Sequence, residues 1–131
     1  MLREARVSVL IPCLNEAQGL RRMLPQMPAW VDEVLVVDNG STDDSAAVAE
    51  ARGARVVGER VRGYGAACRR GLREATGEII VKLDGDCTYP LEAIRVLAET
   101  ALYSSHTNFG FWLWIGVLHG LANRPLTGKA T

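Results

Sequence analysis

Two aspartates separated by one glycine, Asp84-Gly85-Asp86, form the strongest chemical signal in this sequence. They follow the apolar run Ile79-Ile80-Val81, which is typical of a buried strand. Two carboxylates this close repel each other unless a cation lies between them. Mg²⁺ suits such a pair, because it binds one or two carboxylates and completes its coordination with water and phosphate oxygens. The pattern favours a divalent-cation site over a solvated loop with two incidental acids.

A glycine-rich loop, Gly63-Tyr64-Gly65-Ala66-Ala67, precedes a predicted helix and offers free backbone N–H groups to an anion. It is not a dinucleotide fingerprint, since Cys68 stands where the third glycine belongs, and no Gly-Lys-Ser/Thr of a P-loop follows. Alone, it is typical of an ordinary loop. Seven arginines and a single acid, Glu59, lie between residues 52 and 73. This basic stretch suits a phosphorylated ligand or an anionic lipid surface, although helix arginines are usually just solvated.

Short apolar runs alternate with helical patterns along most of the chain. Strands are predicted over residues 7–12, 34–37, 54–57 and 78–83, and helices from 15, over 45–51 and 66–75, and from 90 to about 102. This alternation predicts an α/β fold with a mostly parallel sheet and helices on both faces. Ligands of such sheets bind at the carboxyl ends of the strands. The polar residues that follow predicted strand ends are Asn15, Asp38, Asn39, Asp84 and Asp86; topology alone does not separate a site from ordinary loop polarity.

Composition narrows the class of protein. The 131 residues carry 15 Lys+Arg against 15 Asp+Glu, which fits one globular domain and disfavours a general nucleic-acid binder. Three cysteines without metal spacing argue against a disulfide framework or a zinc site and favour a cytoplasmic chain. The first residues do not resemble a signal peptide. No apolar stretch reaches the roughly 18 residues that span a bilayer.

Three groups of residues together resemble the family 2 glycosyltransferases. Residues 9–16 (VLIPCLNE) resemble the first-strand motif of that family, and residues 36–43 (VVDNGSTD) resemble the second. The glycine loop, Gly77-Glu78 and Asp84-Gly85-Asp86 resemble the third and fourth. The ordered set covers roughly residues 6–97. Residues 84–90 (DGDCTYP) are most similar to the subgroup that makes polyprenyl-phosphate sugars, such as the dolichyl-phosphate mannose synthases.

The resemblance implies a GT-A fold, a UDP- or GDP-linked sugar donor, and Mg²⁺ or Mn²⁺ as cofactor. It implies that Asp84 and Asp86 engage the ribose and the metal-bound diphosphate. Bound metal would stabilise the negative charge that builds on the leaving diphosphate. The other implied donor contacts are Pro12, Asn15 and Glu16 at the nucleoside, Asp38 with Asn39 at the base, and Gly63 and Gly65 where the backbone approaches the nucleotide.

The acceptor half of the family pattern is largely missing. We expect residues 1–102 to form the nucleotide-sugar-binding half, and residues 103–131 to be a remnant of, or a substitute for, the acceptor half in a truncated member. No catalytic base can be nominated, because Glu92 and Glu99 are the only acids after Asp86. A polyprenyl phosphate needs no base, since its phosphate is already ionised. By elimination, a polyprenyl phosphate is therefore favoured as the acceptor. We expect the chain to be peripheral at the cytoplasmic face of a membrane.

Two other functions compete with a glycosyltransferase. Residues 84–88 also fit the nucleophile motif of haloacid-dehalogenase-type phosphatases, but no aspartate follows Asp86 and the downstream lysine is Lys129 in the tail. That phosphatase is disfavoured. A non-catalytic fragment that binds nucleotide and metal stays open beside the enzyme. The apolar residues 109–122 suit either a buried segment covered by a partner or a membrane interface.

Overall fold

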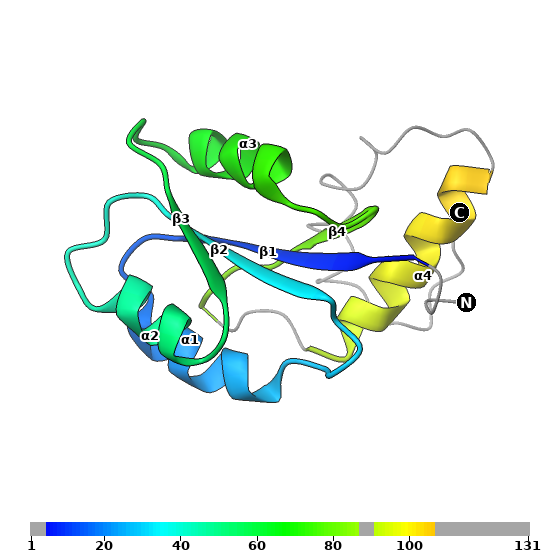
Figure 1. Ribbon diagram of the computed structural model, residues 1–131, viewed down its shortest axis with the longest axis horizontal. Helices are drawn as coiled ribbons and strands as arrows, with labels where there is room; N and C mark the ends of the chain where they lie inside the picture. Colours follow the sequence, from blue (N-terminus) through cyan, green and yellow to red (C-terminus); the bar gives the residue numbers. More distant parts are fainter. Residues whose placement is uncertain (1–4, 87–90, 107–131) are drawn as a thin grey trace.

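The computed structural model of the chain describes residues 5–86 and 91–106 (Figure 1). Strands and helices alternate along these residues, as the hydrophobic pattern predicts. The elements in chain order are β1 (Val7–Cys13), α1 (Ala17–Met23), the 3₁₀ turn η1 (Leu24–Gln26), β2 (Glu33–Asp38), α2 (Ser45–Ala51), β3 (Arg55–Gly58), α3 (Tyr64–Glu74), β4 (Ile79–Lys82) and α4 (Ala93–His106).

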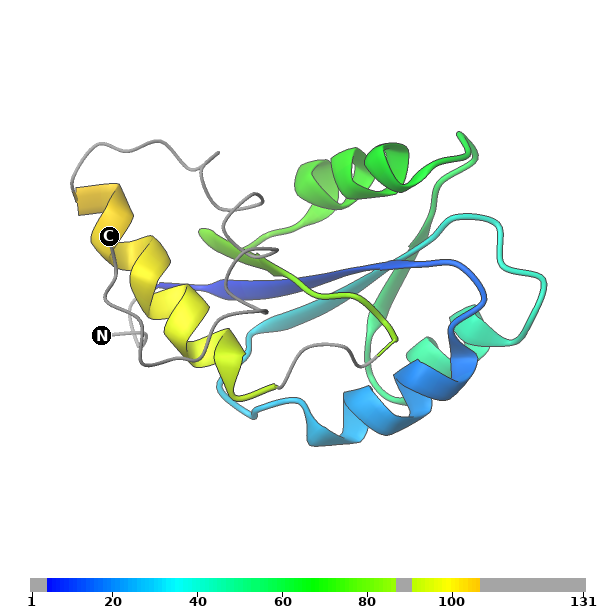
Figure 2. The same ribbon diagram turned by 180° about the vertical axis from the view of Figure 1, so that it is seen from behind.

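The four strands form one parallel sheet in the order β3-β2-β1-β4. Helix α3 covers one face, while α1, α2 and α4 lie on the other (Figures 1 and 2). The predicted fold class, a parallel sheet with helices on both faces, is confirmed. Because every strand runs the same way, the loops that follow β1, β2 and β4 all leave from the side of the sheet where the carboxyl ends of the strands lie. This side is here called the carboxyl edge.

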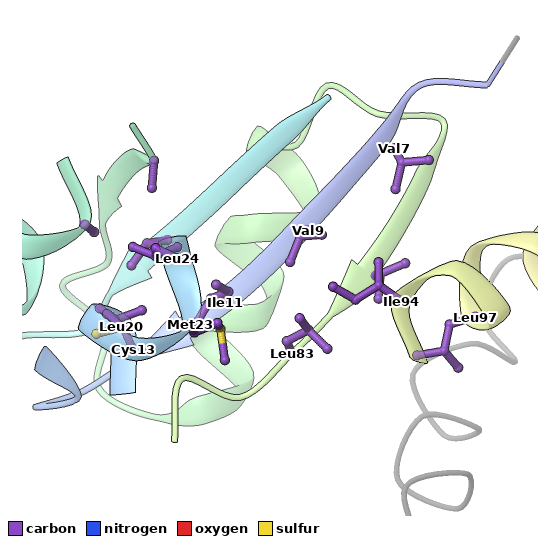
Figure 3. Close-up of a cluster of buried hydrophobic side chains, with 14 of the residues drawn as sticks. Val7, Val9, Ile11, Cys13, Leu20, Met23, Leu24, Leu83, Ile94 and Leu97 are labelled. Atoms are coloured by element: carbon purple, nitrogen blue, oxygen red, sulfur yellow. The ribbon is translucent and has the colours of Figure 1, made fainter. Parts of the chain in front are cut away.

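The central strand β1 is buried at all seven positions, as expected for a parallel strand covered on both faces. Val7, Val9 and Ile11 pack with Leu20 of α1 and Ile94 of α4 in the larger apolar cluster (Figure 3). The residues between them face the other way, where Leu10 packs with Leu35, Val37 and Ala67 under α3. This alternation fixes the strand register and, with it, the positions of the loops at the carboxyl edge.

The end of the last helix differs most from the prediction. Helix α4 continues to His106, beyond the end predicted near residue 102. Serine and histidine cost a helix only tenths of a kcal/mol each, and extending an existing helix adds one hydrogen bond per residue. The predicted domain boundary after residue 102 therefore falls inside α4. Pro90 and the apolar residues 109–122 lie outside the described residues, within which no helix is long and apolar enough to span a bilayer.

We expect Gly71→Ala to destabilise the fold by about 1–3 kcal/mol, the usual cost of overpacking. A Cβ there would overlap Cδ1 of Leu10 and lie 2.7 Å from its Cδ2, and Leu10 is fully buried. Urea unfolding followed by circular dichroism measures the change. Gly65→Ala is the matched control on the same helix, because its Cβ would meet only Nη1 of Arg69, at 3.9 Å. Equal stability of the two variants would contradict the packing argument.

Candidate functional site

The candidate site residues meet at the carboxyl edge, on the left of Figure 1, where β1 and β2 end. Asn15 and Glu16 follow β1, Asp38 ends β2, and the segment Asp84-Gly85-Asp86 follows β4. The Glu16 carboxylate is close enough to Asp84 and Asp86 for both to raise its pKa. The loops after β1 and β4 therefore bring Glu16, Asp84 and Asp86 together, as the parallel topology predicts, whereas Asp38 is not among the charges that act on Glu16.

Asn15 ties the first two of these loops to each other. Its backbone has φ of +53°, a left-handed conformation that asparagine tolerates better than most residues. Its Oδ1 accepts hydrogen bonds from the backbone N–H groups of Thr42, at 2.7 Å, and Asp43, at 3.2 Å. Its own N–H donates to Oγ of Ser41, at 2.9 Å. The structure therefore gives Asn15 a loop-fixing role; its predicted contact with a nucleoside stays a prediction.

Asn39 holds the glycine loop in place. Its buried side chain donates from Nδ2 to the carbonyl oxygens of Glu59, at 3.0 Å, and Val61, at 2.8 Å. Its Oδ1 accepts from the N–H of Gly63, at 2.9 Å. Both amide donors are thus used inside the protein. The neighbouring Asp38 is half-buried, and its Oδ1 accepts from the N–H of Ser41 at 3.2 Å. Its Oδ2 is therefore better placed than Oδ1 to contact a ligand.

Gly63 turns the chain into α3 with φ of +126°, a conformation that disfavours any residue with a Cβ. The turn places Tyr64 beside the segment after β4. Oη of Tyr64 donates to Oδ1 of Asp84 at 3.0 Å, and Nζ of Lys82 lies 3.5 Å from the same oxygen. Lys82 also lies 4.5 Å from the centre of the Tyr64 ring. The glycine loop therefore contacts the segment Asp84-Gly85-Asp86 through Tyr64. The sequence did not predict this contact.

Two glycines let α1 touch the segment that carries the aspartates. A Cβ on Gly19 would overlap the carbonyl oxygen of Gly85, and a Cβ on Gly85 would lie 2.5 Å from Oε2 of Glu16. Gly85 itself is buried, Asp84 is half-buried and Asp86 is exposed. Gly19 was not predicted from the sequence to be a site residue. The available signal was a glycine inside a predicted helix, where it costs about 1 kcal/mol relative to alanine and so suggests a packing reason.

Glu16 has an unusual environment for a carboxylate. Its Oε2 is buried and has no hydrogen-bond partner among the residues that the structure describes. Burial, and then the charges of Asp86, Asp84 and Asp43, raise the pKa of Glu16 to about 7. A cation at this edge would offset both the lost hydration and the repulsion.

The donors at this edge suit a hard divalent cation. Carboxylate oxygens are the ligands that Mg²⁺ prefers, and it uses only one or two of them beside phosphate and water. Within residues 5–86 and 91–106, no group of three or more His, Cys, Asp or Glu side chains is placed to hold a metal ion. The edge therefore fits a metal shared with a phosphate ligand, and the assignment of Asp84 and Asp86 as its ligands stays a prediction.

Comparison with known proteins places the chain among sugar transferases. The family model described as glycosyl transferase family 2 matches residues 8–114. An uncharacterised glycosyltransferase of Mycobacterium tuberculosis is 48% identical over 80 residues, which are 61% of this chain and 36% of that protein. The undecaprenyl-phosphate 4-deoxy-4-formamido-L-arabinose transferase of Sodalis glossinidius is 38% identical over 109 residues, covering 73% of this chain and 33% of its own length.

Solved structures show the same relationship. Glucosyl-3-phosphoglycerate synthase from Mycobacterium tuberculosis, crystallised with Mn²⁺, UDP and glucosyl-3-phosphoglycerate, superposes with a TM-score of 0.57 at 34% identity, over 64% of this chain and 34% of that one. The same enzyme has been crystallised with Mg²⁺ and UDP. The fold and family expected from the sequence are confirmed, and the metals and nucleotide class match the prediction. The chain spans about a third of the length of these relatives.

We expect Gly19→Ala to displace the segment 84–86, because the atom it would overlap is a backbone carbonyl oxygen that cannot rotate away. The amide resonances of Gly85 and Asp86 should shift in a ¹⁵N correlation spectrum, with a destabilisation of about 1–3 kcal/mol or more. Gly71→Ala is the control, since it overpacks the opposite face of the sheet against Leu10. An unshifted Gly85 amide in Gly19→Ala would show that the two segments are not in contact.

A second prediction concerns Glu16 and pH. Because its folded-state pKa of about 7 lies above the ordinary 4.5, the folded state binds this proton more tightly than the unfolded state. Folding stability from this group therefore falls as pH rises from about 4.5 through 7. Without metal, we expect Glu16→Gln to exceed the wild type in stability by about 1–3 kcal/mol at pH 8 and to match it near pH 4.

Urea unfolding in EDTA across this pH range measures the difference. Glu50→Gln, which removes an exposed carboxylate of α2, is the matched control and should show no such pH-dependent gain. A stability difference between Glu16→Gln and the wild type that stays constant with pH would rule out the raised pKa.

Proposed function

The chain belongs to glycosyl transferase family 2, and from that premise we propose that it binds a nucleotide-diphosphate sugar with a divalent cation for sugar transfer to a phosphate-bearing acceptor. The observation that carries the proposal is the meeting of Glu16, Asp84 and Asp86 around the buried Gly85, with one oxygen of Glu16 buried and unpartnered. Carboxylates brought close to one another at the ligand-binding edge of a parallel sheet repel each other, and a bound cation would offset their charge.

We assign the metal to Asp84 and Asp86. When bound, Mg²⁺ or Mn²⁺ would stabilise the negative charge on the leaving diphosphate. Asp84 is half-buried and accepts a hydrogen bond from Tyr64, while Asp86 is exposed. Glu16 faces both from α1. The proposed contacts for the rest of the donor are those of the family pattern: Pro12, Asn15, Asp38, Asn39, Gly63 and Gly65.

A UDP-linked donor is favoured over a GDP-linked one. The synthase from Mycobacterium tuberculosis that superposes on this chain was crystallised with UDP and with UDP-glucose. Its similarity to this chain, at 34% identity, covers 64% of the chain. The sugar itself is left open by this argument.

We propose a polyprenyl phosphate as the acceptor, at the cytoplasmic face of a membrane. The relative from Sodalis glossinidius is named for transfer to undecaprenyl phosphate, and the M. tuberculosis synthase was crystallised with phosphoglyceric acid, so both names point to acceptors that carry phosphate. In this chain, Arg60 and Arg62 are exposed in the loop before α3. Arg55 and Arg70 are instead paired with Glu33, Glu59 and Glu74, so they stabilise the fold.

A second candidate is a nucleotide- and metal-binding module without transferase activity. The observation that favours it is coverage, because the chain spans about a third of the length of its relatives. The two candidates make the same prediction for donor binding and differ only in turnover.

Binding of UDP should depend on metal and on Asp86. We expect calorimetry to show tighter UDP binding with Mn²⁺ than with EDTA, and Asp86→Asn to lose that gain, at a cost of about 2–5 kcal/mol for breaking a charge-assisted contact. Glu99→Gln removes a carboxylate of α4 that pairs with Arg95, and it should bind as the wild type does. GDP, titrated in parallel, tests the choice of base.

Turnover separates the enzyme from the binding module. The full chain is incubated with Mn²⁺, a radiolabelled UDP-sugar, and either undecaprenyl phosphate in detergent or 3-phosphoglycerate. Label in the lipid fraction supports the proposed acceptor, and label in the phosphoglycerate replaces it. Binding without transfer to either supports the module. Absence of heat with both nucleotides, with and without metal, overturns the function as a whole.

A further inference from the structure

The two carboxylates of the proposed metal pair have different surroundings. Asp84 already uses one of its oxygens, since Oδ1 accepts the hydrogen bond from Tyr64 and lies 3.5 Å from Nζ of Lys82. Its Oδ2 makes no hydrogen bond within the part of the chain that the structure describes. The side chain of Asp84 is 24% exposed, which leaves it accessible to a ligand from one side.

Lys82 is a buried cation. Only 4% of its side-chain surface is exposed, and a buried ammonium group is costly unless it is paired. Its neighbours are the Asp84 carboxylate and the face of the Tyr64 ring, a cation–π contact. Lys82 belongs to β4, in register with Leu10 of the central strand, so its backbone is fixed by the sheet.

Tyr64 reaches the same oxygen of Asp84 from the glycine loop. It is the first residue of α3 and follows Gly63, whose N–H is held by Asn39. Tyr64 is 51% exposed, so its ring adds little to the core. The main contact that Tyr64 makes from the glycine loop is therefore its hydrogen bond to Asp84.

We propose that Tyr64 and Lys82 are positioning residues that hold Asp84 by Oδ1 and so direct Oδ2 toward the cation and the donor. The role toward the ligand rests on the proposed function, whereas the hold on Asp84 is a property of the chain alone. Hydrogen bonds to a ligating carboxylate orient it, and their loss commonly lowers metal affinity by about 10–100-fold. The ammonium of Lys82 also offsets part of the negative charge that Glu16, Asp84 and Asp86 bring together.

The hold on Asp84 is tested in the full chain without ligand. The ¹³C resonance of the Asp84 carboxyl carbon, assigned through Asp84→Asn, reports on its hydrogen bonding. Tyr64→Phe keeps the ring over Lys82 and removes only the hydroxyl. Thr76→Val is the matched control, because it removes a hydroxyl that accepts from Nε of Arg6 before β4, at the opposite edge of the sheet. We expect the resonance to move in Tyr64→Phe and to stay in Thr76→Val.

The role toward the ligand is tested by UDP binding with Mn²⁺ and with EDTA. We expect Tyr64→Phe to weaken binding with Mn²⁺ about tenfold, the lower end of the usual range, and to leave binding in EDTA and the melting temperature unchanged. Lys82→Met should weaken it at least as much, with partial recovery in Lys82→Arg. If Tyr64 had a purely structural role, Tyr64→Phe would not change the ratio of the UDP affinity with Mn²⁺ to the UDP affinity in EDTA.

Each outcome decides a different part of the proposal. An unmoved Asp84 resonance in Tyr64→Phe overturns the hold, whether or not the chain binds UDP. A moved resonance with unchanged Mn²⁺-dependent affinity overturns the positioning role. If the wild type binds no UDP while the resonance depends on Tyr64, the proposed function fails and the hold on Asp84 is supported. Should Lys82→Met fail to fold, Tyr64→Phe alone carries the test.

Discussion

The backbone of α1 touches the backbone of the segment after β4 at Gly19 and Gly85, where neither position has room for a Cβ. This contact controls the chemistry of the carboxyl edge. It places the Glu16 carboxylate against Gly85, between the two aspartates of the same segment. The sheet alone would align the ends of β1 and β4, but only a helix this close to the backbone brings their carboxylates into one electrostatic environment. Glycine is required here because space, rather than an unusual backbone angle, is limiting.

The electrostatic cost of that contact is balanced within the protein only in part. Lys82 supplies a positive charge to Asp84, whereas Glu16 has a buried oxygen without a partner and a pKa raised to about 7. Structural carboxylates are usually paired, as Glu33 is here: Ser8, Thr76 and Arg55 donate to it, and despite its burial its pKa is lowered. The contrast between these two glutamates supports the cation site proposed at the carboxyl edge.

Much of this arrangement could be predicted from the sequence, because apolar period and strand order are local or nearly local properties. The buried runs at residues 7–12 and 34–37 predict parallel strands, and parallel strands place Asn15, Asp38 and Asp84 at one edge. What sequence reasoning missed depends on contacts between distant segments. Gly19 looks like a weak point of a helix until Gly85 is placed against it, and Tyr64 looks like a loop residue until Asp84 lies within hydrogen-bond distance. The end of α4 was missed because polar residues there favour neither helix nor loop strongly enough to decide.

The loops at the carboxyl edge are held by one another, and this bears on which functions can be separated. Asn15 fixes the loop after β1 to the loop after β2, and Asn39 fixes the glycine loop to β2. Tyr64 then fixes the glycine loop to the segment after β4. All these contacts lie within residues 15–84, inside the part of the chain that the family model matches. The carboxyl edge is thus supported by contacts within these residues, so the proposed nucleotide binding can be measured separately from the proposed sugar transfer.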